Sequence, residues 1–447
     1  MASIDSSIFK DYDIRGVYPD QVNEDTAFSM GRAFAAFLEE SRVLVGRDMR
    51  LSSPSLSREF IRGLTRQGAD VVDIGLCSTD MLYFASGSLD LPGAMFTASH
   101  NPAQYNGIKM CRRLARPISI KTGIGRMRDM VLSGSIPEPP GPTGSVEEMP
   151  MLDRYVEHVL SFIDLHLIRP LKVVIDAGNG MAGMTVPPVF AKLPCELVPH
   201  CFELDGSFPD HQPNPIEPEN IHLLSNWVLE AGADVGMAFD GDADRVFLVD
   251  EQGAPVSGSL TNAALIKRIL EKSPGEKIIY NVINSWAVPE TIREYGGSPI
   301  RERVGHSFIK QTMLENQAIY GGEHSGHFYF RGNYNADSGI IAALLMLEII
   351  SIENRPLSAI LEPFDRYFSS GEINSRVEDI PGRIEELARK YRDGRQDRLD
   401  GLTVEFSDWW FNVRPSNTEP LIRLNVEAKT DRLMQEKRDQ VLADIRA

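Results

Sequence analysis

One pattern recurs three times along the chain and limits its fold more than any other feature. It consists of a short apolar run, a helical stretch and a second apolar run. The copies begin at "RVLVGRDMR" (Arg42 to Arg50), "KVVIDAGNG" (Lys172 to Gly180) and "KIIYNVINS" (Lys277 to Ser285). Short apolar strands that alternate with helices are typical of βαβ units and mostly parallel sheets. We therefore expect three related α/β domains in series, with one large sheet as the alternative.

Segments between the copies that favour turns and loops predict the domain limits. In the first copy a helix is expected to open at Ser53-Pro54, because proline suits the first helical position. "SGSIPEPPGPTGSVEEMP" (Ser133 to Pro150) is rich in proline and glycine and predicts a linker or surface loop, and "DEQGAP" (Asp250 to Pro255) predicts a turn. The stretch from Leu402 to Ala428 predicts strand, loop and strand before a charged C-terminal helix. The predicted domains are 1–150, 151–254, 255–366 and a small α+β domain over 367–447.

Composition narrows the class of protein. The 447 residues suffice for three or four domains, and the formal charge of −17 argues against a nucleic-acid-binding surface. The N-terminus has no apolar core that resembles a signal peptide. The longest apolar run, Gly339 to Ile350, contains Glu348 and is too short to span a bilayer, so it predicts a buried helix. The four cysteines lack C-x-x-C spacing and are expected to be reduced thiols. We expect a cytoplasmic protein without nucleic-acid or membrane partners.

An acidic triplet, "DGDADRV", places Asp240, Asp242 and Asp244 at alternate positions. Three carboxylates this close resist ionising together without a cation, and hard oxygen ligands suit Mg²⁺ or Ca²⁺. An EF-hand is rejected because Arg245 stands where that loop needs glycine, and because strands are predicted on both sides. At the carboxyl edge of a parallel sheet the triplet predicts a metal site. A solvated acidic turn is the alternative.

Ser99 and His100 suggest a hydrolase nucleophile and its base, but the surrounding segment argues otherwise. There is no G-x-S-x-G motif, and neighbours in an extended chain point to opposite sides. Asn101-Pro102 forces a turn, so His100 and Asn101 are expected mainly to shape a tight loop. A serine without a base can still carry a phosphoryl group if a metal and a cation lie nearby. The acidic triplet and Lys109 could supply these.

Five segments together resemble one known family. They are "FKDYDIRG" (Phe9 to Gly16), "TASHNPAQYNGIK" (Thr97 to Lys109), "DGDADR", "GGEHSGH" (Gly321 to His327) and "RPSNTEP" (Arg414 to Pro420). In this order they resemble the α-D-phosphohexomutases, the group that contains phosphomannomutase and phosphoglucomutase. The resemblance implies an α/β fold of four domains, three of them related, around a central cleft. It spans nearly the whole chain.

The resemblance also implies a mechanism. Ser99 would carry a phosphoryl group, and Asp240, Asp242 and Asp244 would hold Mg²⁺ together with Ser99. The phosphoserine would donate to a hexose monophosphate, and a bisphosphorylated sugar would turn over and return its other phosphate. Hexose 1-phosphate and hexose 6-phosphate would thus interconvert, with hexose 1,6-bisphosphate as intermediate and activator. We expect a monomer or homodimer that acts in carbohydrate metabolism.

Further residues receive roles from the resemblance alone. The implied catalytic residues are Arg15, His100, Lys109 and His306. For Arg15 a surface ion pair is the alternative, for Lys109 simple exposure, and for either histidine a structural role. The implied substrate contacts are Arg245, Gly322, Glu323, His324, Ser325, His327, Arg414, Ser416, Asn417, Thr418 and Arg423. Relatives often have a basic residue in the segment that matches Asn281 to Ala287, where this chain has none. Arg303 is the candidate to replace it.

The expected activity is that of a phosphomannomutase/phosphoglucomutase, because "GEHSGH" retains both glutamate and serine. Phosphoglucosamine mutase is the alternative within the class, although its loop typically has glutamine where His324 stands. A sugar phosphatase that uses Ser99 would instead release inorganic phosphate. A sugar-phosphate sensor is disfavoured because every expected chemical group is present.

Overall fold

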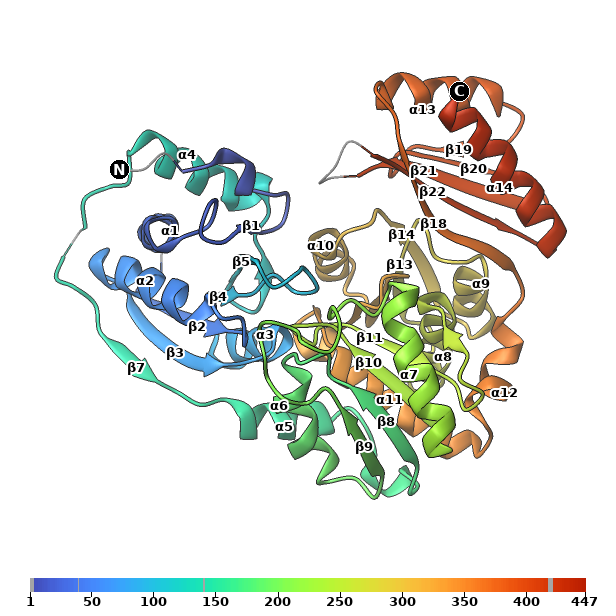
Figure 1. Cartoon of the computed structure of the whole chain (residues 1–447), viewed down its shortest axis with the longest axis horizontal. Coiled ribbons are helices and arrows are strands. Elements are labelled where there is room, and N and C mark those ends of the chain that lie inside the picture. The colour runs from blue at the N-terminus through green and yellow to red at the C-terminus, as the bar shows by residue number, and fades with distance from the viewer. Residues whose placement is uncertain (1–3, 39, 140, 417–420) are drawn as a thin grey trace. The chain divides into compact units, whose positions relative to one another are not determined.

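The computed structural model describes residues 4–38, 40–139, 141–416 and 421–447. Figure 1 shows its helices and strands, coloured from the N-terminus to the C-terminus. The chain divides into two compact units. The first unit contains residues 1–257 and 325–360, and the second contains residues 258–324 and 361–447.

The first sheet of the first unit has seven strands in the order β1-β5-β4-β2-β3-β7, with β6 paired to β5. Strands β2, β3, β4 and β7 are parallel, whereas β5 pairs antiparallel with its neighbours. The strands are β1 (Ile14–Val17), β2 (Arg42–Arg47), β3 (Asp70–Leu76), β4 (Gly93–Phe96), β5 (Tyr105–Arg112), β6 (Arg116–Pro117) and β7 (Val146–Glu148). The sheet is therefore mixed, as expected for this fold.

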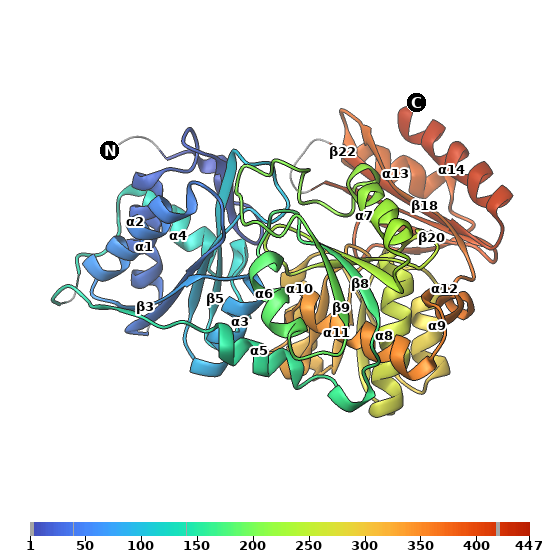
Figure 2. The same cartoon turned by 60° about the horizontal axis from the view of Figure 1, so that its bottom comes forward.

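Helices α1 (Glu24–Phe37), α2 (Ser53–Arg66) and α4 (Gly125–Ser133) bury their apolar side chains in one core with β2, β4 and β5. Helix α3 (Thr79–Leu89) packs with Cys111, whose neighbour Met110 faces the other core, so α3 covers the opposite face (Figures 1 and 2). Glycine lets α1 and α2 approach closely: a Cβ on Gly63 would lie 2.2 Å from the Phe28 carbonyl oxygen.

The second sheet of the first unit has the order β12-β11-β10-β8-β9. Its strands are β8 (Lys172–Asp176), β9 (Glu196–His200), β10 (Val235–Phe239), β11 (Val246–Val249) and β12 (Pro255–Val256). Helix α7 (Pro218–Ala231) packs on β8 and β10 (Figure 2), and α11 (Gly339–Glu353) contacts β11 and α5. The unit also holds α5 (Leu152–Leu160), α6 (Ala182–Phe190) and the antiparallel pair β16 (Phe328–Phe330) and β17 (Ala336–Asp337).

The second unit contains a parallel group of strands in the order β14-β13-β15 and a separate antiparallel sheet in the order β18-β22-β21-β20-β19. The parallel strands are β13 (Lys277–Asn281), β14 (Ser298–Glu302) and β15 (Tyr320–Gly322), covered by α8 (Gly258–Lys272), α9 (Ala287–Glu294) and α10 (His306–Asn316). The antiparallel strands are β18 (Phe368–Arg376), β19 (Arg395–Asp397), β20 (Leu402–Glu405), β21 (Trp409–Pro415) and β22 (Leu421–Ala428). Helices α13 (Ile380–Lys390) and α14 (Asp431–Arg446) close the apolar core of this sheet.

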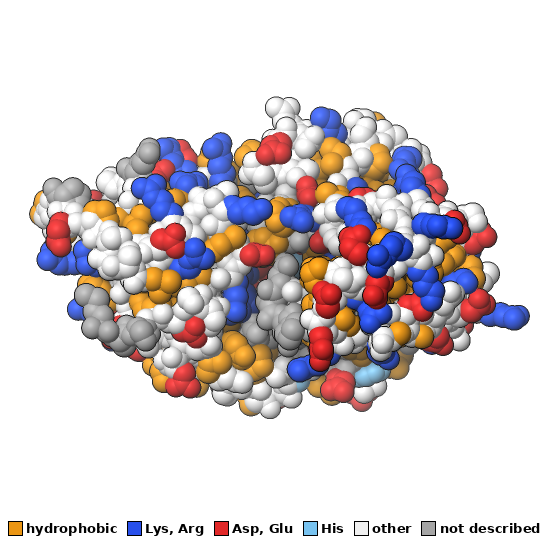
Figure 3. All heavy atoms as spheres, turned by 90° about the horizontal axis from the view of Figure 1, so that it is seen from above, with side chains coloured by type: hydrophobic (Ala, Val, Ile, Leu, Met, Phe, Trp, Pro, Cys, Tyr) orange, Lys and Arg blue, Asp and Glu red, His pale blue; other side chains and the backbone are white. Residues whose placement is uncertain are grey.

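Short helical segments complete the secondary structure. They are η1 (Ser6–Ile8), η2 (Ile120–Ile124), η3 (Leu165–Leu167), η4 (Arg331–Asn333), η5 (Glu362–Phe364) and α12 (Leu357–Leu361). Figure 3 shows acidic and basic side chains interspersed with apolar ones over the face seen from above.

Several predictions from the sequence can be compared with this fold. Separate sheets rule out the single large sheet, and the Gly339 to Ile350 run is buried in α11 as expected. Among the described residues, no helix combines the length and apolarity that a membrane span requires. All four cysteines, each within the described part of the chain, are free thiols. The interpretation of Ser133 to Pro150 as linker or loop is wrong at its end, because β7 pairs there with β3 as an exposed edge strand.

Candidate active site

Ser99 lies in the connection between β4 and β5, and the local backbone presents its hydroxyl. Its φ of 50° is left-handed, a conformation that a non-glycine residue keeps only when its surroundings hold it there. Its backbone N–H donates to Thr97 Oγ1 at 2.9 Å, and the N–H of Asn101 donates to the Ala98 carbonyl at 3.0 Å. The loop is thus a tight turn held by its own hydrogen bonds.

Arg50 holds the same loop through hydrogen bonds to its backbone. The sequence did not identify Arg50 as a site residue. Its guanidinium is completely buried and donates to four carbonyl oxygens. These belong to Ser99 at 2.8 Å, Asn101 at 2.6 Å, and Pro102 and Tyr105, both at 2.9 Å. Asp48 lies 3.3 Å from the Arg50 Nε and compensates its charge. The available signal was a pair of opposite charges directly after the buried strand β2.

The acidic triplet occupies the connection between β10 and β11, at the carboxyl end of β10. Strands rather than helices flank the triplet on both sides, which agrees with the rejection of an EF-hand. Asp240, Asp242 and Asp244 are each at most 1% exposed. Their carboxylates offer oxygen atoms that lie within 4.8 Å of one another. Burial contradicts the alternative of a solvated acidic turn.

Two oxygens of this triplet are suited to a metal ion. Asp242 Oδ1 and Asp244 Oδ1 are buried and, within the described part of the chain, have no hydrogen-bond partner. A buried carboxylate oxygen without a partner is costly unless a cation satisfies it. Clustered carboxylate oxygens are the donors that Mg²⁺ prefers. The residues present therefore fit a magnesium ion.

Ser99 meets the triplet directly, because its hydroxyl donates to Asp240 Oδ2 at 2.7 Å. Arg245 donates to the same oxygen through Nε at 3.0 Å and Nη2 at 2.9 Å. Burial, together with the Asp244 and Asp242 charges, raises the pKa of Asp240 to about 7 against the opposing Arg245 charge. One oxygen atom of Asp240, a candidate metal ligand, therefore accepts hydrogen bonds from both the candidate nucleophile Ser99 and the buried cation Arg245.

Lys109, on β5, reaches into the triplet from the opposite side. Its Nζ lies 2.7 Å from Asp242 Oδ2 and 2.7 Å from Asp244 Oδ2. Burial alone would lower the pKa of Lys109, but the Asp242 and Asp244 charges outweigh burial and raise it well above its usual range. Lys109 is therefore a fixed ammonium that compensates the carboxylates, and the alternative of an exposed lysine is wrong.

Arg15 and His100 flank the serine. Arg15 donates to Asn101 Oδ1 at 2.6 Å and also pairs with Asp13, so the ion pair and the contact with the serine loop are both present. His100 Nδ1 lies 3.3 Å from Ser99 Oγ. The expectation that these neighbours point to opposite sides is wrong, because the left-handed backbone of Ser99 is not extended. Burial, with the Arg245 and Arg15 charges, lowers the pKa of His100 well below its usual range.

Ser325 and His327 belong to the first unit and lie near the triplet. His327 forms an isolated backbone bridge with Arg245. Its Nε2 lies 3.7 Å from Asp244 Oδ1, and its Nδ1 lies 3.0 Å from the Ser325 hydroxyl. These contacts place the end of the "GGEHSGH" segment beside the acidic triplet.

In the second unit, Glu323 is the centre of a buried polar group. Its Oε1 accepts hydrogen bonds from Asn281 Nδ2 at 3.2 Å and from the Gly305 N–H at 3.1 Å. Asn284 Nδ2 donates to Asn281 Oδ1 at 2.8 Å and to the Gly322 carbonyl at 3.1 Å. The segment that lacks a basic residue therefore supplies two amides that orient Glu323.

Three further predicted residues, His306, His324 and Arg303, also belong to the second unit. His306 is the first residue of α10 and follows Gly305, whose φ is 134°. His324 Nδ1 lies 3.4 Å from the Ser259 hydroxyl, and burial lowers the pKa of His324. Arg303 lies over the Phe308 ring at 4.7 Å and donates to the Leu399 carbonyl at 3.4 Å. Its replacement of the absent basic residue stays a prediction.

Arg414 and Arg423 are cross-strand neighbours on β21 and β22. Both pair with one carboxylate: Glu372 Oε1 lies 2.9 Å from Arg423 Nη1, and its other oxygen accepts from Arg414. Arg423 also donates to the Ser416 hydroxyl at 3.4 Å. Asn417 and Thr418 lie outside the described residues. Glu372 was not predicted as a site residue, because nothing in the local sequence around it indicates that β18 pairs with β22.

Each unit, taken by itself, holds groups that suit phosphoryl chemistry. The first unit brings a hydroxyl, three carboxylates and two buried cations to one place, and two of the carboxylates have an oxygen without a hydrogen-bond partner among the described residues. The second unit presents paired guanidiniums, which bind phosphate or carboxylate oxygens with defined geometry. Phosphoryl transfer depends mainly on positioning and charge neutralisation, and both are present here.

Models of one family match the chain in four consecutive parts. The descriptions are "Phosphoglucomutase/phosphomannomutase, alpha/beta/alpha domain I" for residues 6–124, "domain II" for 153–253, "domain III" for 257–367 and "C-terminal domain" for 372–443. The matched segments cover most of the chain. The domain limits drawn from the sequence remain predictions.

Curated proteins and solved structures agree with these matches. The chain is 42% identical to the "Phosphohexose mutases" protein of Xanthomonas campestris pv. campestris, with 98% of each chain covered. It is 40% identical to "Phosphomannomutase" of Salmonella typhimurium, with 97% of each covered. A crystal structure of a phosphoglucomutase/phosphomannomutase family protein from Burkholderia thailandensis is 34% identical, with a TM-score of 0.91 and coverage of 99% of this chain and 97% of that one.

Proposed function

Because the chain belongs to the phosphoglucomutase/phosphomannomutase family and is a mutase, we propose that it interconverts hexose 1-phosphate and hexose 6-phosphate through phosphorylated Ser99. One observation carries the proposal. The Ser99 hydroxyl stands on a strained, fully hydrogen-bonded turn, 2.7 Å from Asp240 within the buried acidic triplet. A serine used only for structure would need neither the strain nor these neighbours.

Asp240, Asp242 and Asp244 would hold Mg²⁺ together with an oxygen of Ser99 or of its phosphate. When bound, the ion would neutralise negative charge on the transferring phosphoryl group. Arg245 and Lys109 compensate the three carboxylates, since one pairs with Asp240 and the other with Asp242 and Asp244. They also hold each carboxylate in a fixed orientation, so little reorganisation is needed on binding.

The transfer needs a proton acceptor in each direction. In the forward step the bond from phosphorus to Ser99 Oγ breaks, a bond to a sugar hydroxyl oxygen forms, and that hydroxyl loses its proton. In the return step Ser99 attacks the bisphosphorylated sugar and loses its own proton. His100 Nδ1 lies 3.3 Å from Ser99 Oγ, so we assign His100 as the candidate acceptor in the return step. We keep His306 as the candidate acceptor in the forward step.

Substrate binding is assigned to the remaining predicted residues. Glu323 and Ser325 would accept and donate hydrogen bonds with sugar hydroxyls, beside Gly322, His324 and His327. Arg414 and Arg423 would bind the phosphate that is not transferred. That phosphate would replace the Glu372 carboxylate as the partner of the two guanidiniums. Hexose 1,6-bisphosphate would act as intermediate and as the activator that rephosphorylates Ser99. We favour mannose phosphate because a curated relative is named phosphomannomutase, and glucose phosphate because the matching family models are described as phosphoglucomutase/phosphomannomutase.

A side-by-side assay tests the proposal. The purified protein is given mannose 1-phosphate, glucose 1-phosphate or glucosamine 1-phosphate with Mg²⁺ and a hexose 1,6-bisphosphate. We expect hexose 6-phosphate from the first two substrates and no accumulation of inorganic phosphate. Preference for glucosamine 1-phosphate would favour the alternative mutase, and stoichiometric release of inorganic phosphate would favour a sugar phosphatase. Either result would overturn the assignment.

A further inference from the structure

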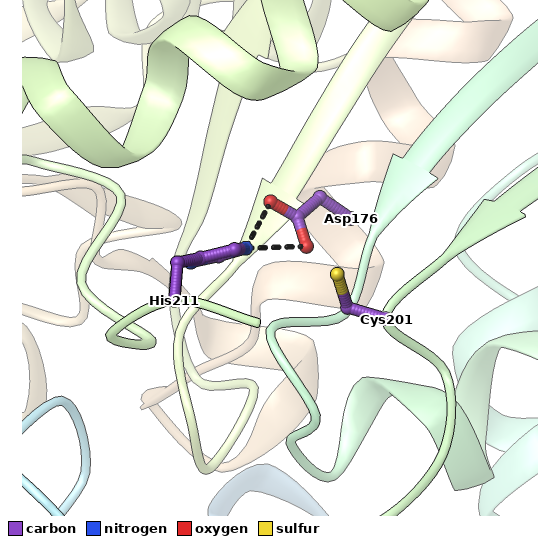
Figure 4. Close-up of side chains that lie close together, drawn as sticks. All are labelled: Asp176, Cys201 and His211. Carbon is purple, nitrogen blue, oxygen red and sulfur yellow. Dashed lines mark hydrogen bonds and ion pairs between the residues drawn. The ribbon is translucent and has the colours of Figure 1, made fainter. Parts of the chain in front are cut away.

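Three side chains that have no part in the proposed reaction converge in the first unit (Figure 4). Asp176 is the last residue of β8, Cys201 directly follows β9, and His211 lies in the connection between β9 and α7. Asp176 is 2% exposed, and the other two are partly buried. The three residues therefore come from separate segments that only the fold brings together.

The geometry of the three groups is that of a ligand set. His211 Nε2 lies 3.2 Å from Asp176 Oδ1 and 3.0 Å from Oδ2, and Cys201 Sγ points toward the same carboxylate (Figure 4). One ligand atom from each residue lies within 4.8 Å of the others. In a tetrahedral zinc site, metal–ligand distances of about 2.0–2.3 Å place neighbouring ligand atoms about 3.3–3.8 Å apart. Small side-chain movements suffice to reach that spacing.

The imidazole of His211 is oriented as in known metal sites. Its Nδ1 donates to the Gln212 carbonyl at 2.9 Å, and this bond directs Nε2 at Asp176 and Cys201. A backbone carbonyl on one ring nitrogen is the usual way in which proteins fix the tautomer of a metal-binding histidine. The same bond argues against a thiol protease-like triad, in which Asp176 and Cys201 would occupy different ring nitrogens. Burial raises the pKa of the Cys201 thiol, so the thiolate requires a nearby cation to compensate its charge.

We propose that Asp176, Cys201 and His211 bind a divalent transition-metal ion of the zinc class, at a site distinct from the acidic triplet. Thiolate and imidazole ligands select such ions, whereas Mg²⁺ requires oxygen ligands. On binding, the Cys201 thiol and the His211 Nε2 each release a proton to solvent. Three protein ligands leave a fourth position for water. Asn179 lies next to these ligands, because its backbone N–H donates to the Cys201 carbonyl oxygen at 2.8 Å.

The site connects to the serine loop through the segment that it would fix. Phe208 of this segment lies under the Arg50 guanidinium at 5.0 Å, and a Cβ on Gly206 would lie 2.5 Å from the Arg50 Cα. Arg50 in turn holds the carbonyls of the Ser99 loop. A metal ion at Cys201 and His211 would clamp the chain on both sides of Gly206 and Phe208. We therefore assign the ion a stabilising role rather than a chemical one.

Cobalt titration tests the proposal, because a Co²⁺–thiolate bond gives a near-ultraviolet charge-transfer band and an all-oxygen site does not. The full-length protein is stripped with a chelator and titrated with Co²⁺ and then Zn²⁺. We expect one equivalent of Co²⁺ with the band, and Zn²⁺ should displace it. The affinity should fall at least tenfold in Cys201→Ser and in His211→Gln. Cys195→Ser is the matched control, since Cys195 is a partly buried free thiol of the same domain and should change nothing.

Folding of the variants is checked separately, so that loss of binding is not mistaken for loss of structure. Far-ultraviolet circular dichroism of each variant should match the native protein, and Asp242→Asn should retain the cobalt band. With the acidic triplet saturated by Mg²⁺, added Zn²⁺ should raise the melting temperature of the native protein but not of Cys201→Ser. Absence of the band in the native protein, or an unchanged band in folded Cys201→Ser, would overturn the proposal.

Discussion

Replacement of Arg50 by lysine tests how the serine loop is presented. Arg50 gives hydrogen bonds to the carbonyls of Ser99, Asn101, Pro102 and Tyr105 and also compensates Asp48. Lysine keeps the positive charge but has only three donors on one nitrogen, without the planar fork. At least one carbonyl, and in practice about two, must therefore lose its donor.

The cost can be worked out from this count. A buried carbonyl left without a donor costs about 1–3 kcal/mol, so the loss of two donors in Arg50→Lys should lower the free energy of unfolding by about 2–6 kcal/mol. For a folding unit of this size, 1 kcal/mol corresponds to about 2–4 °C in the melting temperature. We expect Arg50→Lys to melt at least about 4 °C below the native protein. Mutase activity should fall as well, because the Ser99 hydroxyl is no longer held toward Asp240.

Differential scanning calorimetry measures the loss of stability, and hydrogen–deuterium exchange over residues 97–105 locates it. Arg47→Lys is the matched control three residues earlier, at the end of β2, because among the described residues the Arg47 guanidinium makes one partly exposed ion pair, with Asp73 at 3.5 Å. Such pairs contribute about 0–1 kcal/mol. If Arg50→Lys melted like Arg47→Lys and the loop exchanged at the native rate, the assignment of Arg50 as the support of the loop would be refuted.

Three further predictions concern other parts of the chain. Arg414→Ala should lower kcat/KM about 10- to 150-fold, because each charge-assisted hydrogen bond contributes about 1.5–3 kcal/mol; native kinetics would remove Arg414 from the site. Burial raises the pKa of Asp80 to about 6, so the folded state holds this proton more tightly than the unfolded chain does. The stability of the native protein relative to Asp80→Asn should therefore fall by about 3 kcal/mol as the pH rises from about 4 to about 6, and a flat difference in chemical denaturation would contradict this. Gly63→Ala should lower the free energy of unfolding by about 1–3 kcal/mol in the same assay, because its Cβ would lie 2.2 Å from the Phe28 carbonyl oxygen. An unchanged free energy of unfolding would show that α1 and α2 can separate at no cost.

The sequence predicts most of the fold because its local signals agree with one another. Apolar runs mark the parallel strands, and the apolar stretch from Gly339 becomes a buried helix as expected. The acidic triplet could be placed at a strand end because the preceding run is apolar and the spacing alternates. The edge strand β7 was missed because it has three residues, two of them glutamates and all of them exposed, and because proline and glycine precede it. Edge strands of this kind carry little sequence signal.

The details of the site were harder to predict, for physical reasons. The left-handed backbone at Ser99 cannot be inferred from its residue type, and it decides where His100 points. Arg50 and Glu372 act through partners on other strands, so their roles depend on register and packing. The same holds for Asp176, Cys201 and His211, which only the second sheet and its connections bring together. Local patterns identify reactive residue types, whereas long-range packing determines which of them meet.

The central claim is that Ser99 carries the transferred phosphoryl group, and peptide mass spectrometry tests it most directly. The native protein and Ser99→Ala are incubated with glucose 1,6-bisphosphate and Mg²⁺, and then with mannose 1-phosphate. We predict one phosphoryl group on the peptide that contains Ser99, its loss when mannose 1-phosphate is added, and neither signal nor turnover in Ser99→Ala. A phosphoryl group on another residue, or native turnover by folded Ser99→Ala, would contradict the account.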